Sequence, residues 1–531
     1  MLYKLGDLVG HYYSGGINIM SKLLKIVLTV LLAIVYMNSG FGISTAKAIQ
    51  DELTLALTPT AIKGLDPLVH TLANGVPLIQ STLLTTDKNL GITYDLADEY
   101  QVSNDKLTWE FKLRDDAYFS NGEKVKASDV SFSFNQAKYN GWIELSALKE
   151  AEVIDDYTVH FHLNRPQSTF AYTVTQLGVV PEKQYDEFYS VNPVGSGPYI
   201  LEEWQEGEKA VFSRNENYYG EKSIFKRIKI LFMDEEAAYA AAQKGIVDMA
   251  QTSPIFAKVG VDDMEIKAFK GIDQYGIAFA GLSSGTVDFS TQADSDISVR
   301  KAINLAIDRD QFINEILNGY GEAAYNDAER LPWGYKDEEA EYSNIEKAKE
   351  ILKIDGWADI DGDGVLEKQG VQARLTLQFH KSDSVAQYLA KLLKQQLAEL
   401  GIVVDLKSQK WAEISLSRYK DPVLMCIGSH NPMDLYHRYH TDNRGKEFYH
   451  TNLYSATKVD QLIEESLISG DFDTWQLTQR AIASDVPWIW LVNPEYLFFT
   501  KKGLNLGEPV LLSSEQPLLL LKNIEEWVWE E

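Results

Sequence analysis

The sequence predicts an α/β fold of at least two lobes, and three observations support this. At 531 residues the chain exceeds the roughly 250–300 residues at which a single hydrophobic core stops growing. Strand-like and helical segments are mixed in irregular order, which favours an α/β chain over a repeat or a barrel. The composition, 45% hydrophobic and 24% charged, is that of a soluble globular protein.

The N-terminal segment has the order of a secretory signal peptide. An apolar stretch at 26–37 follows a basic segment, and Ala-Lys-Ala at 46–48 forms a small-x-small cleavage site. The apolar stretch is too short to span a bilayer, so an uncleaved membrane anchor is the weaker alternative. We predict that residues 1–48 are an upstream segment and signal peptide, that the mature chain starts near residue 49, and that it is exported to the periplasm.

Charge and cysteine content exclude several classes of function. A formal net charge of -27 repels nucleic acid and anionic lipid headgroups, so neither is an expected partner. Cys426 is the only cysteine, which rules out an intrachain disulfide. Export without disulfides suits a bacterial periplasm.

Five segments alternate apolar and polar residues as half-buried strands do. They lie at 51–59, 107–113, 157–163, 209–214 and 227–233.

Apolar residues three and four positions apart predict three helices. The first covers 127–139, with Ser128 as its expected N-cap. The others cover 298–319 and 382–401, and each closes on a glycine. Near 268–275 and again near 485–493 the pattern passes from helix to extended structure. We expect the chain to cross between lobes at these two places, which would form a hinge.

A serine-nucleophile motif is present without its structural context. GLSSG at 281–285 matches G-x-S-x-G and follows a strand-like segment, but the next residues are polar and not helical. A chance loop explains the match better, and an exported hydrolase using Ser283 is the alternative.

Two further groups resemble metal sites. Asp359, Asp361 and Asp363 have the spacing of a calcium loop, but Gly370 stands where the bidentate glutamate belongs, so an Asx-rich turn is the simpler interpretation. His160 and His162 alternate to one face of a predicted strand and could meet one metal ion. Tolerated polar residues on a half-exposed strand are the commoner case.

The segment at 428–450 is the strongest candidate site. It contains four of the nine histidines and mixes them with tyrosines and an arginine. Neutral imidazole suits nickel, copper and zinc, while arginine and tyrosine suit carboxylate-bearing chelators and peptide ends. A solvated loop is the alternative, because the histidine spacing follows no tight chelating signature.

Four ordered blocks carry a resemblance to one family: LTWEFKLRDDAYFSNGEKVKASDVSFSF at 107–134, GSGPYILEEWQEGEKAVFSRNENYYG at 195–220, SVRKAINLAIDRDQFINEILNGYGEAA at 298–324 and AKEILKIDGWADIDGDGVLEKQG at 348–370. In order and spacing they resemble the periplasmic solute-binding proteins of peptide and nickel ABC importers, known as bacterial extracellular solute-binding protein family 5. The resemblance extends over nearly the whole mature chain.

The resemblance implies the two-lobed periplasmic binding protein fold (type II, cluster C), with a hinge between the lobes. Lobe I would comprise 49–271 plus 491–531, and lobe II would comprise 272–490. It also implies a monomeric, non-enzymatic receptor with no catalytic cofactor. Its partners would be a permease and ATPase complex and a small solute, either a metal chelate or a short peptide.

The resemblance also suggests where the solute binds. Trp142 falls at a pocket tryptophan of the nickel binders, and His70 falls at a pocket tyrosine. The pocket arginine of those proteins would lie at 175–181, where this chain has none. The aspartate that pairs with a peptide's amino terminus in peptide binders would fall near His430, and a neutral imidazole does not hold an ammonium as a carboxylate does.

These features favour a metal chelate, with nickel and a histidine-like or opine-like chelator as the expected solute and a dipeptide or oligopeptide as the alternative. His430 and His437 are the candidate metal ligands. The full set of predicted ligand-binding residues is His70, Trp142, His430, Tyr436, His437 and Arg444.

Overall fold

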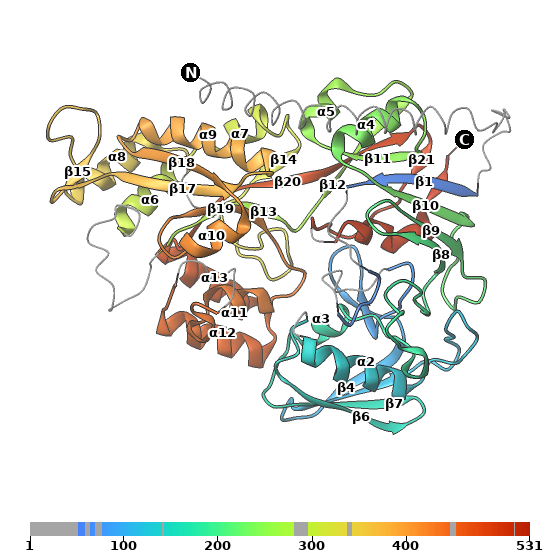
Figure 1. Cartoon of the computed structure of the whole chain (residues 1–531). Helices are drawn as coiled ribbons and strands as arrows, with labels where there is room; N and C mark the ends of the chain where they lie inside the picture. Colours follow the sequence, from blue (N-terminus) through green and yellow to red (C-terminus); the bar gives the residue numbers. More distant parts are fainter. Residues whose placement is uncertain are drawn as a thin grey trace, which may run out of the picture. The chain divides into compact units, whose positions relative to one another are not determined.

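A single 14-residue strand, β20 (Trp488–Lys501), runs through the middle of a twelve-stranded sheet (Figure 1). Its N-terminal part pairs antiparallel with β13 (Gln274–Ala278) and β14 (Gly321–Ala323). Its C-terminal part pairs antiparallel with β11 (Met249–Thr252) and β12 (Met264–Lys270). One continuous strand therefore belongs to both halves of the sheet.

The computed structural model describes residues 51–58, 64–69, 77–140, 143–280, 296–336, 342–446, 453–514 and 516–530. All of them belong to one compact unit, Asp51–Glu531. The predicted signal peptide at 1–48 lies outside these ranges. Within them, no helix combines the length and the apolar character needed to cross a membrane.

The rest of the large sheet confirms three of the predicted strands. Its other members are β1 (Glu52–Leu57), β8 (Tyr199–Gln205), β9 (Lys209–Arg214), β10 (Arg227–Phe232), β17 (Arg374–His380), β18 (Val403–Gln409) and β19 (Val423–Ile427). The order is β18-β17-β19-β13-β20-β11-β1-β10-β9-β8. β1 is parallel to β10 and β11, and β17 is parallel to β18 and β19, which is the mixed pairing expected of an α/β chain.

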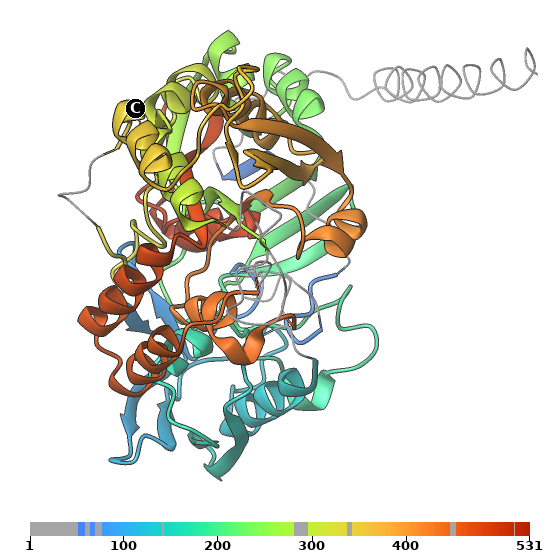
Figure 2. The same ribbon diagram turned by 90° about the vertical axis from the view of Figure 1, so that its left-hand side faces the viewer.

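Helices accompany both halves of the sheet. They are α4 (Glu235–Gln243), α5 (Pro254–Val259), α6 (Ile297–Ala306), α7 (Arg309–Glu315), α8 (Ile345–Ile354), α9 (Ser384–Ala398), α10 (Trp411–Ser417), α11 (Met433–Tyr439), α12 (Thr457–Ser469) and α13 (Phe472–Asp485), with the 3-10 helices η1 (Glu182–Gln184), η3 (Thr441–Asn443) and η4 (Pro517–Glu526). In Figure 1 and Figure 2, α11, α12 and α13 lie together.

A separate four-stranded antiparallel sheet contains the other two predicted strands. Its order is β4 (Ala97–Val102), β5 (Thr108–Leu113), β7 (Thr158–Leu163) and β6 (Leu148–Asp155), accompanied by α2 (Ala127–Asn140) and α3 (Phe170–Val174). Trp109, Phe111 and Phe161 alternate to the buried face and pack on Phe134 of α2 and Phe170 of α3. The opposite face of this sheet is therefore left to polar residues.

Three two-stranded antiparallel sheets complete the strands. They are β2 (Leu84–Thr86) with β3 (Ile92–Tyr94), β15 (Glu367–Lys368) with β16 (Val371–Gln372), and β21 (Leu504–Asn505) with β22 (Val528–Trp529).

Three local expectations differ from the structure. α2 begins at Ala127, so Ser128 lies inside the helix, and Asp129 accepts a hydrogen bond from Lys126 N at 2.9 Å instead. The predicted helix at 298–319 is two helices, because Asp308 caps α7 by accepting from Gln311 N at 3.1 Å. At 268–275 the chain passes from strand β12 to strand β13 rather than from a helix.

Arg330 binds both chain passages between the two halves of the large sheet. Its guanidinium donates to the Gly271 carbonyl at 3.1 Å, between β12 and β13. It also donates to the carbonyls of Asn493 at 3.0 Å and Pro494 at 3.3 Å in β20. Near 485–493 the chain passes from helix α13 to strand β20, as the sequence pattern predicts. The lobe boundaries themselves remain a prediction.

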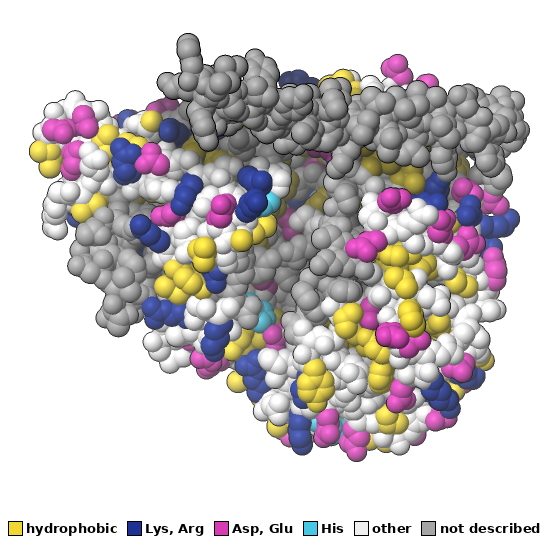
Figure 3. Space-filling model, viewed as in Figure 1, with side chains coloured by type: hydrophobic (Ala, Val, Ile, Leu, Met, Phe, Trp, Pro, Cys, Tyr) yellow, Lys and Arg dark blue, Asp and Glu magenta, His cyan; other side chains and the backbone are white. Residues whose placement is uncertain are grey.

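Acidic and basic side chains are interspersed on the face drawn in Figure 3. Magenta carboxylates and dark blue cations are scattered among uncharged groups over its described surface. The charges drawn on this face are therefore not gathered in one acidic patch.

A buried ion pair connects α11 to the segment after β14. Arg438 Nη1 lies 2.6 Å from Asp327 Oδ1, and the two side chains are only 4% and 5% exposed. Asp327 Oδ2 also accepts a hydrogen bond from the Tyr439 hydroxyl at 2.7 Å. Arg438 Nη2 also lies 2.5 Å from Asp434 Oδ2, so the buried guanidinium has two carboxylate partners.

We therefore expect Asp327→Ala to lower the free energy of unfolding by about 1.5–3 kcal/mol, since Arg438 would keep Asp434 but lose its more deeply buried carboxylate partner. The matched control is Asp405→Ala, which removes an ion pair with Arg374 whose side chains are 48% and 50% exposed. The control should cost less than about 1 kcal/mol. Equal urea midpoints for the two variants would contradict this account.

Candidate functional site

A cavity with a volume of about 850 Å³ lies in the described part of the chain. Its wall combines the β2-β3 hairpin, the segments around residues 175–176 and 218–220, His430, and the C-terminal segment with η4. These segments are far apart in sequence, so only the tertiary structure forms the cavity. A volume of this size accommodates a small solute with several polar groups.

Among the predicted site residues that the structure describes, only His430 lies on this wall. It follows β19, and its Nε2 lies 2.7 Å from the Leu511 carbonyl oxygen. A carbonyl only accepts hydrogen bonds, so Nε2 carries the proton and Nδ1 keeps a lone pair. Burial lowers the pKa of His430 to about 4, with the positive charge of Lys522 acting in the same direction. The ring is therefore neutral at pH 7.

The cavity also contains a buried cation from η4. Lys522 Nζ donates to Thr86 O at 2.9 Å and to Thr86 Oγ1 at 2.8 Å. Burial lowers the pKa of Lys522 to about 8, so this lysine is still mainly protonated at pH 7. Its place on the wall makes it a candidate partner for a carboxylate.

Arg114, Tyr219 and Asp95 form a connected group of charged and polar side chains on the same wall. Arg114 lies over the Tyr219 ring at 4.1 Å, and the Tyr219 hydroxyl donates to Asp95. Burial raises the pKa of the Asp95 carboxyl, although the hydrogen bond from Tyr219 opposes this shift. All of these residues line the cavity, so it presents groups of both signs to a solute.

Thr175 and Gln176 line the cavity in the segment where the resemblance placed a pocket arginine. The positive groups on the wall are instead Arg114, Lys522 and Lys88, of which Lys88 pairs with Glu508. Sequence reasoning missed all three residues as site candidates. Arg114 stood within one of the family blocks and so carried a weak signal, whereas nothing local marked Lys522.

Tyr436 and His437 of α11 contact other residues and are not among the described residues that line the cavity. His437 Nε2 lies 3.1 Å from Glu144 Oε2. Arg165 Nη1 lies 3.4 Å from the Tyr436 hydroxyl, and its guanidinium is 5.2 Å from the ring centre. These contacts attach α11 to the segments that flank β6 and β7.

The remaining predicted site residues are placed only in part. Arg444 is half-buried at the end of η3 and is not among the described cavity residues. His70 and Trp142 lie outside the described residues, as does Ser283. His430 and His437 have different partners in this structure, and their joint binding of a metal stays a prediction.

The aspartate side chains of the turn at 359–364 form Asx turns with the backbone. Asp359 accepts hydrogen bonds from Gly362 N at 2.7 Å and Gly364 N at 3.0 Å. Asp363 accepts from Val365 N at 2.8 Å. These carboxylates bind the backbone of their own turn, as the simpler interpretation expected.

The sequence profile of the bacterial extracellular solute-binding proteins, family 5, matches residues 91–443. The chain belongs to this family. This family 5 protein is 25% identical to the oligopeptide-binding protein AppA of Bacillus subtilis over 85% of this chain and 86% of AppA. It is 24% identical to the nickel-binding periplasmic protein of Escherichia coli over 69% of this chain and 73% of that protein.

A solved structure has the same fold. NikZ from Campylobacter jejuni, in complex with Ni(L-His), superposes with a TM-score of 0.76 at 22% identity, covering 90% of this chain and 99% of NikZ. The family 5 protein thus has the predicted α/β fold of cluster C periplasmic binding proteins.

Membership in the family identifies the general role. The chain is the substrate-binding component of an ABC importer of peptides or nickel, and its partners are a permease, an ATPase and a small solute. Proteins of this family are non-enzymatic transport receptors, so the hydrolase alternative for Ser283 is not retained. Related proteins are periplasmic or extracellular.

The pairing of Glu144 with His437 generates a pH prediction. Burial alone would raise the pKa of Glu144, but hydrogen bonds from His437 and Ser146 outweigh burial and hold this pKa below its usual value of 4.5. A carboxyl group with a lowered pKa stabilises the fold above pH 4.5, and this contribution is lost as the pH falls through the folded-state value.

Replacing Glu144 by Gln removes the ionisable group with little change in shape. We expect the wild type to exceed Glu144→Gln in stability at pH 7, and this difference to shrink as the pH falls below 4.5. Urea denaturation of both proteins at pH 7 and at pH 3.5 measures the difference. A difference that is constant across this range would show that the carboxylate charge has no part in the contact.

Proposed function

We propose that this protein captures a small metal chelate, with nickel and a histidine-like or opine-like chelator as the solute, and delivers it to the permease. The proposal depends mainly on His430, an imidazole on the wall of the 850 Å³ cavity. Support also comes from the relatives, since NikZ was solved with Ni(L-His) and another relative is named a nickel-binding protein.

His430 has the hydrogen-bonding state of a metal ligand. Histidines that bind metals usually donate their other ring N–H to a carbonyl or carboxylate, which fixes the tautomer and the ring orientation. His430 donates Nε2–H to the Leu511 carbonyl, and Nδ1 has no hydrogen-bond partner among the described residues. Because the ring is neutral at pH 7, no proton has to be displaced before Nδ1 binds a metal.

The charges of the cavity suit a chelator that carries carboxylates and amines. Lys522 and Arg114 offer positive groups for carboxylates, and Asp95 offers an acceptor for an amine. We place His430 in the first coordination sphere or in direct contact with the chelator. His70, Trp142 and Arg444 remain proposed contacts.

For Tyr436 and His437, contacts with Arg165 and Glu144 favour a role in joining the two proposed lobes. Lobe I would contain Arg165 and Glu144, and lobe II would contain α11. A solute held by both lobes favours the closed form, because only contacts present in that form shift the equilibrium. The closed protein would then dock on the permease after export to the periplasm by its cleaved signal peptide.

A dipeptide or oligopeptide is the second candidate solute. AppA, the relative matched over 85% of this chain, is named an oligopeptide-binding protein. A cavity of about 850 Å³ with charges of both signs would also accept a short peptide. The solute retained by the protein separates the two candidates.

The test compares Ni(L-His) binding by calorimetry in the wild type and in His430→Gln. Glutamine keeps a donor for the Leu511 carbonyl but provides no imidazole, so we expect binding at least tenfold weaker, or about 1.4 kcal/mol. His380→Gln is the matched control, since His380 stacks on Trp411 at 5.0 Å and is not among the cavity residues.

Unchanged affinity in His430→Gln would remove this residue from the site. Native mass spectrometry of protein exported by its own host gives an independent readout, because a retained nickel complex has a distinct mass. Recovery of short peptides without metal would overturn the chelate proposal in favour of the peptide alternative.

A further inference from the structure

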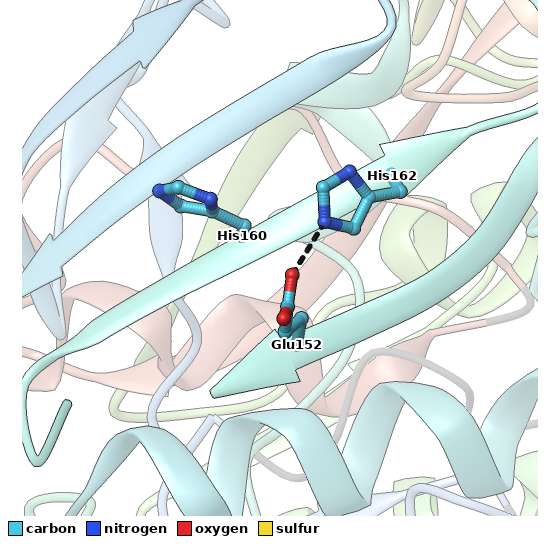
Figure 4. A group of neighbouring side chains, drawn as sticks. All are labelled: Glu152, His160 and His162. Carbon is cyan, nitrogen blue, oxygen red and sulfur yellow. Dashed lines mark hydrogen bonds and ion pairs between the residues drawn. The ribbon is translucent and has the colours of Figure 1, made fainter. Parts of the chain in front are cut away.

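The outer face of the four-stranded sheet gathers imidazole and carboxylate groups from three adjacent strands. His160 and His162 lie on β7, and Glu152 comes from β6 (Figure 4). Glu110 lies opposite His160 on β5. The ligand atoms of Glu152, His160 and His162 lie within 4.8 Å of one another. Histidine and glutamate together are the ligand types of zinc and nickel sites.

Each imidazole has one contact that would orient it toward a metal. His160 Nε2 lies 2.8 Å from Glu110 Oε2, and His162 Nδ1 lies 3.4 Å from the Thr108 hydroxyl. His160 donates Nε2–H to the Glu110 carboxylate, which leaves a lone pair on Nδ1. His162 now donates Nε2–H to Glu152, so binding a metal through Nε2 would move the ring proton to Nδ1, beside the Thr108 hydroxyl. Second-sphere partners of this kind hold the rings of metal-binding histidines.

We propose that this face binds one divalent transition-metal ion of the zinc type, through His160, His162 and Glu152. His162 Nε2 and Glu152 Oε2 now lie 2.8 Å apart and would bind the ion between them. Glu110 stays on His160 as the second-sphere acceptor, and water takes the fourth position. The two carboxylates balance the charge of a divalent ion.

The sheet supplies a rigid base for such a site. The opposite faces of β5 and β7 bury Trp109, Phe111 and Phe161, which fixes the backbone from which the ligands extend. Ligands bound to one zinc ion at about 2.1 Å lie roughly 3.4 Å from one another. The partly exposed side chains of His162 (29%) and Glu152 (55%) have room to rotate into that spacing.

This site is separate from the proposed solute cavity. None of its four residues is among the described residues that line the cavity, and His430 is not part of it. Ions that prefer all-oxygen ligands, such as Mg²⁺, are not expected to bind, because two of the three ligand atoms are imidazole nitrogens.

The test is a Zn²⁺ titration of the metal-stripped full chain without a histidine tag, followed by calorimetry at pH 7.5. We expect the wild type to bind one more equivalent of Zn²⁺ than His162→Gln, and Glu152→Gln to bind that equivalent at least tenfold more weakly. The control His380→Gln should retain it. All three substituted positions are partly exposed, and circular dichroism would confirm that each variant is folded.

A second readout counts the nitrogen ligands. With Cu²⁺ as the probe, electron paramagnetic resonance should report two imidazole nitrogens in the wild type and one in His162→Gln. Equal Zn²⁺ stoichiometry and affinity in the wild type and His162→Gln would overturn the proposal. So would the absence of Zn²⁺ binding up to about 1 mM, which would leave the cluster as cross-strand His–Glu pairs.

Discussion

The arrangement of the described chain depends on β20, which continues without interruption from one half of the large sheet to the other. Where its partners change from β13 and β14 to β12, the strand contains Pro494, which donates no backbone hydrogen bond. Arg330 compensates at this place, because its guanidinium binds the carbonyls of Gly271, Asn493 and Pro494. One side chain thus ties together both passages of the chain at the point where a hinge would bend.

The cavity shows how burial adjusts the groups that face a solute. His430 is kept neutral by burial and is fixed in one tautomer by the Leu511 carbonyl. Lys522 keeps its charge at pH 7 although burial lowers its pKa to about 8, and Thr86 satisfies two of its hydrogens. A neutral nitrogen ligand and a buried cation on the same wall suit a metal complex of an amino-acid-like chelator better than an ammonium group alone.

The histidines of the 428–450 segment have different environments although they are close in sequence. His430 lies on the cavity wall, whereas His437 is on α11 and pairs with Glu144. His440 is 6% exposed and stacks on Tyr436 at 4.6 Å. A run of imidazoles is therefore not one site here, because His430 precedes α11, His437 lies within it and His440 follows its last residue, and each contacts a different part of the chain.

The sequence by itself determined the strands β1, β5, β7, β9 and β10, the positions of α2 and α9 to within a few residues, and the family, since periodicity and ordered blocks are local properties of the chain. It also indicated His430 as a candidate site residue, and His430 lies on the cavity wall. Only the tertiary structure brought Lys522 to Thr86, Arg330 to Gly271 and Glu152 to His162. These contacts depend on how distant segments pack, and hydrophobic periodicity records which face of an element is buried but not which other segment covers it.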